Sequence, residues 1–190
     1  MKLIIASNNN HKITEIKQIL GDRFDSILSL REAGIDHETV EDGVTFMQNA
    51  EKKAAEIAEI SGCAALADDS GICAHALDGA PGVYSARFSG VHGNDEDNNT
   101  LLLEKLRDKE DKGAHYTCAI CLAYPDGRRL FAEGYMYGPI TENRRGNRGF
   151  GYDPLCVPEG ESRTVAEMTE EEKNAISHRA NALKALLEQL

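Results

Sequence analysis

Hydrophobic and polar positions change period several times along the chain, and each change marks a predicted element. Residues 2–6 form a short apolar run that is typical of a buried strand. The polar stretch 7–12 follows, and apolar residues then recur at helical spacing, at Ile13, Ile16, Ile19 and Leu20. This order of strand, polar loop and helix predicts half of a βαβ unit. A second strand is predicted at 24–30. A helix is predicted from Thr45, with these residues on or near one face: Phe46, Ala50, Ala54, Ile57 and Ala58.

The second half of the chain continues with strand patterns and turn chemistry. Residues 115–124 and 129–136 are two β-like runs separated by the turn sequence Pro125-Asp126-Gly127, which predicts an antiparallel hairpin. A helix is predicted over 94–107. The segment 75–93 is rich in Gly and Pro, and we expect it to be a long structured loop.

The last predicted helix carries the clearest boundary signal. Thr169 followed by Glu172 forms a capping-box pattern. The helical stripe beyond it consists of Ile176, Ala180, Leu183, Leu187 and Leu190. A very short strand is predicted at 155–157. Taken together, the elements predict an α/β fold, with one mixed sheet flanked by helices in a single domain over residues 1–190.

Two adjacent carboxylates interrupt the apolar run 63–74. We expect a short buried strand that ends at Asp68-Asp69-Ser70-Gly71, near the edge of the sheet. Two neighbouring carboxylates need a proton, a metal ion or basic partners, because like charges repel. This segment alone is equally compatible with a functional site and with a polar turn in which Asp68 caps a backbone amide. If the strand continues, the two side chains point in different directions.

The charge balance limits the classes of partner. The chain has 190 residues and a formal net charge of -11, with 32 acidic against 21 basic residues. This balance argues against binding to nucleic acid or to an anionic membrane, because both reward clustered Lys and Arg. A small polyphosphate needs only a local basic cluster and a divalent cation. No apolar run approaches the roughly 18–20 residues of a membrane span, and no secretory signal is recognisable, so we expect a cytoplasmic protein.

The five cysteines fit reduced thiols, since their number is odd and their spacing shows no pairing. Cys118 and Cys121 have the CxxC form within a predicted strand. Residues three apart on a strand point to opposite faces, which argues against a shared metal ion.

Two basic positions lie where an anion would be held. The polar loop 7–12 precedes a helix, so its amides and Lys12 form either an anion site or a simple N-cap. Asn49 and Lys53 are four residues apart on one helix face, although a lysine there is by default a solvated charge.

Six segments in the same order resemble one family across nearly the whole chain. The family is that of the non-canonical purine NTP pyrophosphatases, also called Ham1-like, which act on inosine and xanthosine triphosphates. The matching segments are Ala6–Lys12; Thr45-Phe46 with Asn49-Ala50 and Lys53-Ala54; Ala67–Gly71; Gly79–Arg87; Gly149–Pro154; and Ala166–Thr169 through Lys173 to Ser177-His178-Arg179.

The resemblance implies hydrolysis of ITP, dITP or XTP to the monophosphate and pyrophosphate, with Mg2+ and in a homodimer. It also implies an elongated mixed sheet in two lobes around a central cleft. Asp69 would be the catalytic acid–base residue or a metal carboxylate, and Glu41 a second metal carboxylate. The implied substrate-binding residues are Ser7, Asn8, Asn9, Asn10, His11, Lys12, Lys53, Ser70, Phe150, Gly151, Tyr152, Asp153, Lys173, His178 and Arg179.

The residue chemistry suits a 6-oxo purine. Arginine offers only donors, and a suitably protonated His178 adds another, so both would favour a 6-oxo acceptor over the amino group of adenine. Phe150 or Tyr152 would stack on the base or serve only in packing. For the second metal carboxylate that the resemblance implies, Glu41 and Asp42 are both candidates.

The sequence also departs from the family pattern. The phosphate loop has no glycine after its hydroxyl residue, Gln48 stands at a frequent glutamate, and Arg148 stands at a frequent glycine. Two rival hypotheses remain open. One is a Maf-like pyrimidine nucleotide pyrophosphatase, and the other is a nucleotide sensor that does not hydrolyse its ligand.

Overall fold

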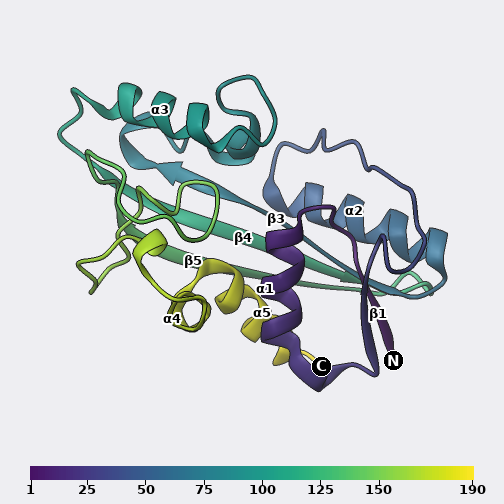
Figure 1. Cartoon of the computed structure of the whole chain (residues 1–190). Helices are drawn as coiled ribbons and strands as arrows, with labels where there is room; N and C mark the ends of the chain where they lie inside the picture. Colours follow the sequence, from purple (N-terminus) through teal and green to yellow (C-terminus); the bar gives the residue numbers. More distant parts are fainter. The chain divides into compact units, whose positions relative to one another are not determined.

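A computed structural model describes all 190 residues. Five strands form one sheet in the order β2-β1-β3-β4-β5, and the chain divides into two compact units (Figure 1). The first unit comprises residues 1–69, 118–134 and 179–190. The second unit comprises residues 70–117 and 135–178.

The long strands contribute residues to both units, and the helices divide between them. The first unit contains β1 (Lys2–Ile5), α1 (Asn10–Leu20), β2 (Ser26–Ser29), α2 (Phe46–Ser61) and nearly all of α5 (His178–Leu187). The second contains α3 (Asp95–Leu106) and α4 (Glu170–Ile176). The shared strands are β3 (Ala64–Ala74), β4 (Gly113–Ala123) and β5 (Arg129–Pro139).

In the first unit, the sheet is covered on both faces. β1 pairs in parallel with β2 and with β3. Successive strand residues point to opposite faces: Leu3 and Ile5 pack with residues of α1 and α5, whereas Ile4 and Ala6 pack with residues of α2. Figure 1 shows α1 and α5 side by side, with α2 on the other face of the sheet. The continuous apolar run of β1 therefore serves two cores.

The second unit has a core of its own. Ile72 of β3 and Tyr116 of β4 pack with Leu102 and Leu106 of α3. The Asn94 side chain accepts a hydrogen bond from the Asp97 amide and caps α3 at its N-terminus. The predicted structured loop 75–93 is ordered by two 3-10 turns, at His75–Leu77 and Gly82–Arg87.

Most of the predicted elements are confirmed, including the mixed α/β fold. The hairpin closes where the Tyr124 amide donates to the Arg128 carbonyl at 2.9 Å. Cys118 and Cys121 lie in different cores, as their spacing predicted, and all five cysteines are free. The short strand at 155–157 was wrong: only an isolated bridge joins Cys156 to Ile140.

The prediction that a strand ends at the two carboxylates near a sheet edge was wrong. β3 runs on to Ala74, so Asp68 and Asp69 lie in the middle of the central strand. Gly71 does not form a turn. A Cβ atom there would lie 2.3 Å from the Ser85 hydroxyl oxygen, so the glycine permits close packing that a side chain would block.

The last helix is two helices. Ser177 has extended backbone angles and separates α4 from α5. The capping box of Thr169 and Glu172 is confirmed at the start of α4. The break resets the helical phase, so Ile176 is exposed although Ala180 and Leu183 are buried. Leu190 lies beyond the end of α5 and is exposed as well.

No helix combines the length and the apolar character that crossing a membrane requires. The single domain over residues 1–190 stays a prediction, as does the cleft.

Candidate functional site

Asp68 and Asp69 point to opposite faces of β3. Residues 64 and 66 of this strand pack in the core with α1 and α5, whereas residues 65 and 67 pack with α2. By the same alternation, Asp68 faces α1 and α5, and Asp69 faces α2. The two neighbouring carboxylates are thereby kept in separate environments.

Asp68 is a fully buried anion held by two cations. Lys12 Nζ lies 3.1 Å from its Oδ2 atom, and Arg179 donates to the same atom from Nη2 at 2.9 Å and from Nε at 3.2 Å. Burial would raise the pKa of Asp68, but the charges of Lys12 and Arg179 outweigh it and hold the pKa well below its usual range. Asp68 therefore stays ionised and fixes its partners.

Arg179 lies inside the first unit with only 1% of its surface exposed. Besides Asp68, its guanidinium donates from Nη1 to Glu15 on α1. Burial opposes the charged form, yet the carboxylate of Asp68 raises the pKa of Arg179 above its usual value. The structure thus places this side chain against two carboxylates. The predicted contact with a base stays a prediction.

Asp69 has a different environment on the α2 face. Its exposed fraction is 8%, and Asn49 Nδ2 donates to its Oδ2 atom at 2.9 Å. Burial raises the pKa of Asp69, while the charges of Lys53 and Lys12 act in the opposite direction. Asp69 is therefore a buried carboxylate for which the cost of desolvation outweighs the neighbouring positive charges, and such a group is suited to accepting a proton or a metal ion.

Lys53 is bonded to the loop before α2, and its charge acts on Asp69. Its Nζ atom donates to Glu41 Oε2 at 2.8 Å. Burial would lower the pKa of Lys53, but the charges of Asp69 and Glu41 raise it, so the lysine is a cation there. The default interpretation of Lys53 as a solvated surface charge was therefore wrong.

The structure favours Glu41 over Asp42 as the second carboxylate near Asp69. Glu41 is close enough for its charge to raise the pKa of Asp69. Asp42 instead pairs with Lys52 at 2.8 Å, and its side chain is 69% exposed. The loop that carries Glu41 is anchored by Asn49, whose Oδ1 atom accepts from the Gly43 amide at 2.8 Å.

The chemistry of Asp69 and Glu41 fits a magnesium ion. Mg2+ in nucleotide enzymes is usually bound by one or two carboxylates together with substrate phosphates, and keeps several waters. The pair supplies that number of carboxylates. No group of three or more His, Cys, Asp or Glu residues is arranged as a complete protein cage for a metal ion.

The loop before α1 is both a cap and an exposed polar surface. The Asn9 side chain accepts from the amides of His11 and Lys12, and Ser7 Oγ accepts from the Asn9 amide. The predicted N-cap is confirmed. The four residues 8–11 are exposed, so their side chains are accessible to an anion.

In the second unit, the glycine-rich loop 149–154 is built around Asp153. This buried carboxylate accepts from Lys173 Nζ at 2.8 Å and from the Phe150 amide at 3.1 Å. Lys173 also lies over the Phe150 ring, 4.7 Å from its centroid. Gly149 has φ +73°, and a Cβ atom there would lie 2.1 Å from Asp153 Oδ2, so only glycine fits.

The other predicted residues of this unit divide into packed and accessible ones. The His178 ring stacks on Tyr116 with centroids 4.5 Å apart. Tyr152 is buried, and its hydroxyl donates to the Ser85 carbonyl at 2.7 Å, which favours the packing interpretation. Phe150 and Ser70 are half-buried.

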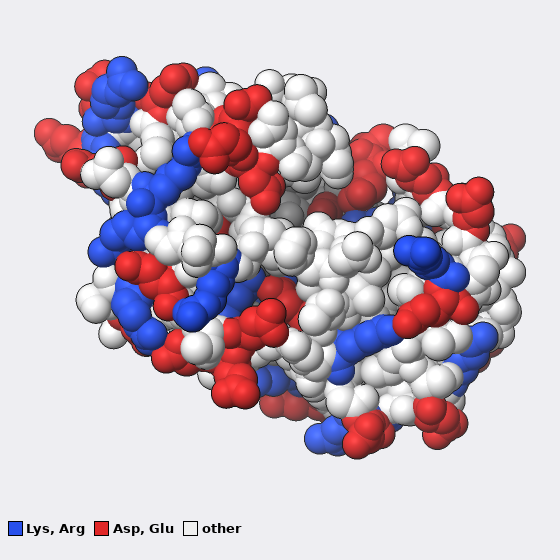
Figure 2. Space-filling view, viewed as in Figure 1, with Lys and Arg blue, Asp and Glu red and all other residues white.

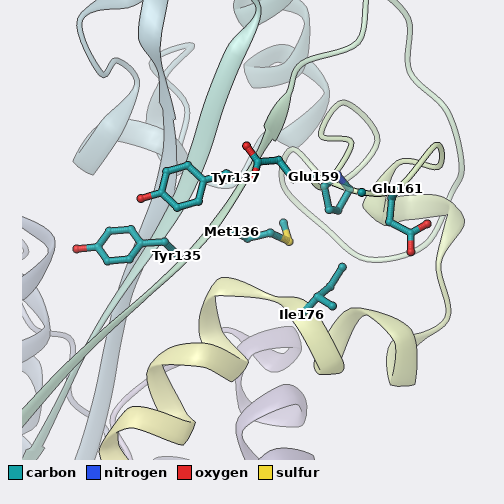
Figure 3. A pocket seen from close by; sticks show the side chains of 8 residues that line it. Tyr135, Met136, Tyr137, Glu159, Glu161 and Ile176 are labelled. Atoms are coloured by element: carbon teal, nitrogen blue, oxygen red, sulfur yellow. The ribbon is translucent and has the colours of Figure 1, made fainter.

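One pocket of the second unit is separate from these residues. It has a volume of about 270 Å3 and is lined by Tyr135, Met136, Tyr137, Pro158, Glu159, Gly160, Glu161 and Ile176. Figure 3 shows Met136 and Ile176 on one side of β5 and the two tyrosine rings on the other. None of its lining residues is a predicted site residue.

Figure 2 shows Lys and Arg side chains interspersed with acidic ones on the displayed face.

Asn49 was not among the site residues predicted from the sequence. The feature that could have indicated it is a polar side chain among the apolar positions of α2, next to Ala50. A buried amide needs partners, and Asn49 finds them in Asp69 and Gly43.

Known proteins match this chain over nearly its whole length. The sequence pattern of the Ham1 family matches residues 3–189. The chain belongs to the Ham1 family. A dITP/XTP pyrophosphatase from Clostridium perfringens is 50% identical to this Ham1 protein, over all of the chain and 97% of that relative. A dITP/XTP pyrophosphatase from Streptomyces coelicolor is 46% identical, over 98% of the chain and 95% of the relative.

Solved structures of Ham1 proteins have the same fold. The Staphylococcus aureus Ham1 protein has a TM-score of 0.88 and 37% identity, covering 100% of this chain and 99% of that one. A HAM1 protein from Coxiella burnetii has a TM-score of 0.89 and 36% identity, with full coverage of both chains. The resemblance inferred from the six segments is confirmed.

Proposed function

We propose that this Ham1 protein hydrolyses non-canonical purine nucleoside triphosphates, namely ITP, dITP and XTP, to the monophosphate and pyrophosphate. The observation that carries the proposal is the buried Asp69 carboxylate, which Asn49 orients and Lys53 and Glu41 flank. The names of the relatives from C. perfringens and S. coelicolor support the choice of substrate.

The residues around Asp69 and the loop 7–12 would bind the triphosphate and the attacking water. Asp69 accepts the proton of a water that attacks the α-phosphorus, or orients that water. Lys53 and Lys12 offset negative charge near it, and the exposed side chains of the loop 7–12 bind the phosphates. Asp69 and Glu41 would hold Mg2+, which supplies charge neutralisation in phosphoryl transfer.

Residues of the loop 149–154 and their neighbours would contribute to recognition of the nucleoside. Phe150 offers a half-buried ring, and the loop through Asp153 is fixed by Lys173. Ser70 and His178 complete the predicted substrate contacts there. A donor aimed at the 6-position forms a hydrogen bond with the 6-oxo group of hypoxanthine or xanthine. In adenine the same donor would face the amino group, which is another donor, and this mismatch is a strong form of discrimination.

For Arg179, the geometry favours a structural role over a direct hydrogen bond to the base. Its contacts to Asp68 and Glu15 tie the start of α5 to β3 and α1. Asp68 acts as the anion that holds Lys12 and Arg179 in place.

The proposal also includes a homodimer and a cytoplasmic location. The free thiols are compatible with a reducing compartment. Neither nucleic acid nor a membrane is proposed as a partner, in keeping with the acidic composition.

A panel of nucleotides tests the function. Purified protein with Mg2+ should release pyrophosphate from ITP, dITP and XTP with a kcat/KM at least about 100-fold above those for ATP, GTP and UTP. Comparable hydrolysis of UTP or TTP would contradict the proposal in favour of a Maf-like enzyme. Nucleotide binding without pyrophosphate release would contradict it in favour of a sensor.

A further inference from the structure

Two residues of α3 hold the two backbone polar groups of Gly151, its amide and its carbonyl, in the loop 149–154. The Gly151 amide donates to Asp95 Oδ2 at 2.7 Å. The Gly151 carbonyl accepts from Asn99 Nδ2 at 2.8 Å. Asp95 and Asn99 are four residues apart, so they lie on the same face of the helix. We call this arrangement the Gly151 clamp.

The clamp is partly removed from solvent, since Asp95 and Gly151 are half-buried. Asn99 is 3% exposed, and its Nδ2 atom also donates to the Asp95 carbonyl at 2.6 Å, which fixes the side chain on the helix. Gly151 has φ +61°, and the loop around it has no regular secondary structure. Its backbone groups depend on such side-chain partners, because no ladder or helix supplies them.

A neighbouring residue of α3 holds the second loop of this unit. Asn98 accepts from the Ser89 amide at 2.8 Å and donates to the Ala86 carbonyl at 3.3 Å. The 3-10 turn Gly82–Arg87, which precedes Ser89, is also bonded to the loop 149–154, since the Tyr152 hydroxyl donates to the Ser85 carbonyl. The buried polar residues of α3 therefore hold both the loop that precedes the helix and the loop 149–154, which is distant in the sequence.

We propose that Asp95 and Asn99 are positioning residues that hold the loop 149–154 in its substrate-binding conformation. This inference rests on the proposed function. Phe150 and Asp153 lie one and two residues from the clamped glycine, so release of Gly151 displaces the ring and the carboxylate that Lys173 contacts. Substrate affinity then falls, while the chemistry at Asp69 is left largely intact.

Asp95→Ala with Asp97→Ala as its matched control tests the clamp. Both residues lie in the first turn of α3 and both changes remove one negative charge there, but Asp97 contacts Asn94 instead of Gly151. Asp95→Ala should raise the KM for dITP about tenfold, with kcat changed less than about threefold. Asp97→Ala should leave both constants near those of the wild type.

Two further variants separate positioning from general stability. Asp95→Asn keeps an oxygen that accepts from the Gly151 amide, so it should restore the KM. Asn99→Ala should raise the KM as Asp95→Ala does. Hydrogen exchange of the peptide that spans 149–154 should accelerate in both alanine variants of the clamp, and not in Asp97→Ala.

The outcomes distinguish the clamp from the proposed function. An active wild type in which Asp95→Ala and Asp97→Ala have equal KM and equal exchange would overturn the clamp alone. A fall in kcat without a rise in KM would overturn it too. A wild type that releases no pyrophosphate from any nucleotide overturns the proposed function, and the clamp's role in substrate binding with it.

Discussion

Two neighbouring aspartates acquire different chemistry because strand geometry sends them to opposite faces. Asp68 meets Lys12 and Arg179 and is held ionised. Asp69 accepts from the Asn49 amide, Lys53 is bonded to Glu41 nearby, and burial raises the pKa of Asp69. The first carboxylate is therefore suited to holding structure, and the second to accepting a proton or a metal ion.

Asp69→Asn tests the assignment of the reactive carboxylate. We expect turnover of dITP to fall by roughly 10²- to 10⁴-fold, because the amide cannot accept the proton of water. Binding of dITP should persist, because the phosphate-binding loop and Lys53 are unchanged. Steady-state kinetics and calorimetric titration measure the two effects, and circular dichroism checks the fold. Near-normal turnover would remove Asp69 from the mechanism.

Arg179→Ala tests whether the arginine supports structure or reads the base. The geometry predicts a loss of about 3–5 kcal/mol in the free energy of unfolding, because Asp68 stays buried after losing a cation. Adding Asp68→Asn should recover part of that loss. Chemical denaturation gives both values. If stability is unchanged and the preference for ITP over ATP is lost, the base-reading hypothesis is correct instead.

At the scale of residues, the sequence predicted opposite directions for the two aspartates only on the condition that the strand continued past them, and it did not predict their partners. Alternation along a strand is a local rule, so the opposite directions of Asp68 and Asp69 followed from it. The pairing of Asp68 with Arg179 spans 111 positions, and no local pattern contains it. The family motif named Arg179, but only the packed structure shows the carboxylates beside it.

At the scale of elements, the spacing of hydrophobic residues predicted the positions of most helices and strands. It failed where a single non-helical residue separated two helices. Ser177 leaves the helical conformation between α4 and α5, so the periodicity that joined Ile176 to Ala180 did not describe one surface. The length of β3 was missed for a related reason. Asp-Asp-Ser-Gly has turn composition, but β3 lies between β1 and β4 in the sheet, and its Gly71 packs closely against Ser85, so the chain stays extended.

Glu32 links two elements of the first unit and gives a pH prediction. Its carboxylate accepts from Lys17 on α1 and from the Ser29 amide at the end of β2. The bond from Lys17, followed by those from Ser29, lowers the pKa of Glu32 to about 2. A lowered folded-state pKa contributes stability above the unfolded value of about 4.3, and that stability is lost as pH falls toward 2.

Glu32→Gln should therefore flatten the loss of stability between about pH 4.3 and pH 2. Urea unfolding at a series of pH values measures the slope. Asp36→Asn is a suitable control, since it removes a carboxylate from the same segment. An acid slope as steep in Glu32→Gln as in the wild type would show that the pairing does not persist in solution.

At the scale of the whole molecule, an acidic protein is proposed to bind a polyanion through local cations. The net charge is -11, yet Lys12 and Lys53 lie half-buried beside carboxylates in the first unit, and Lys173 lies beside Asp153 in the second. Composition excluded nucleic acid and anionic membranes as expected partners, but it gave no indication of a nucleotide. That indication came from six separated segments and is supported by relatives that match the full chain.

Hydrolysis of dITP in oxygen-18 water tests the central claim most directly. If water attacks the α-phosphorus, the label enters dIMP and the pyrophosphate stays unlabelled, because the bond from the α-phosphorus to the leaving pyrophosphate is the one that breaks. Mass spectrometry of both products measures the label. Oxygen-18 in the pyrophosphate, or release of inorganic phosphate with dIDP, would contradict the account.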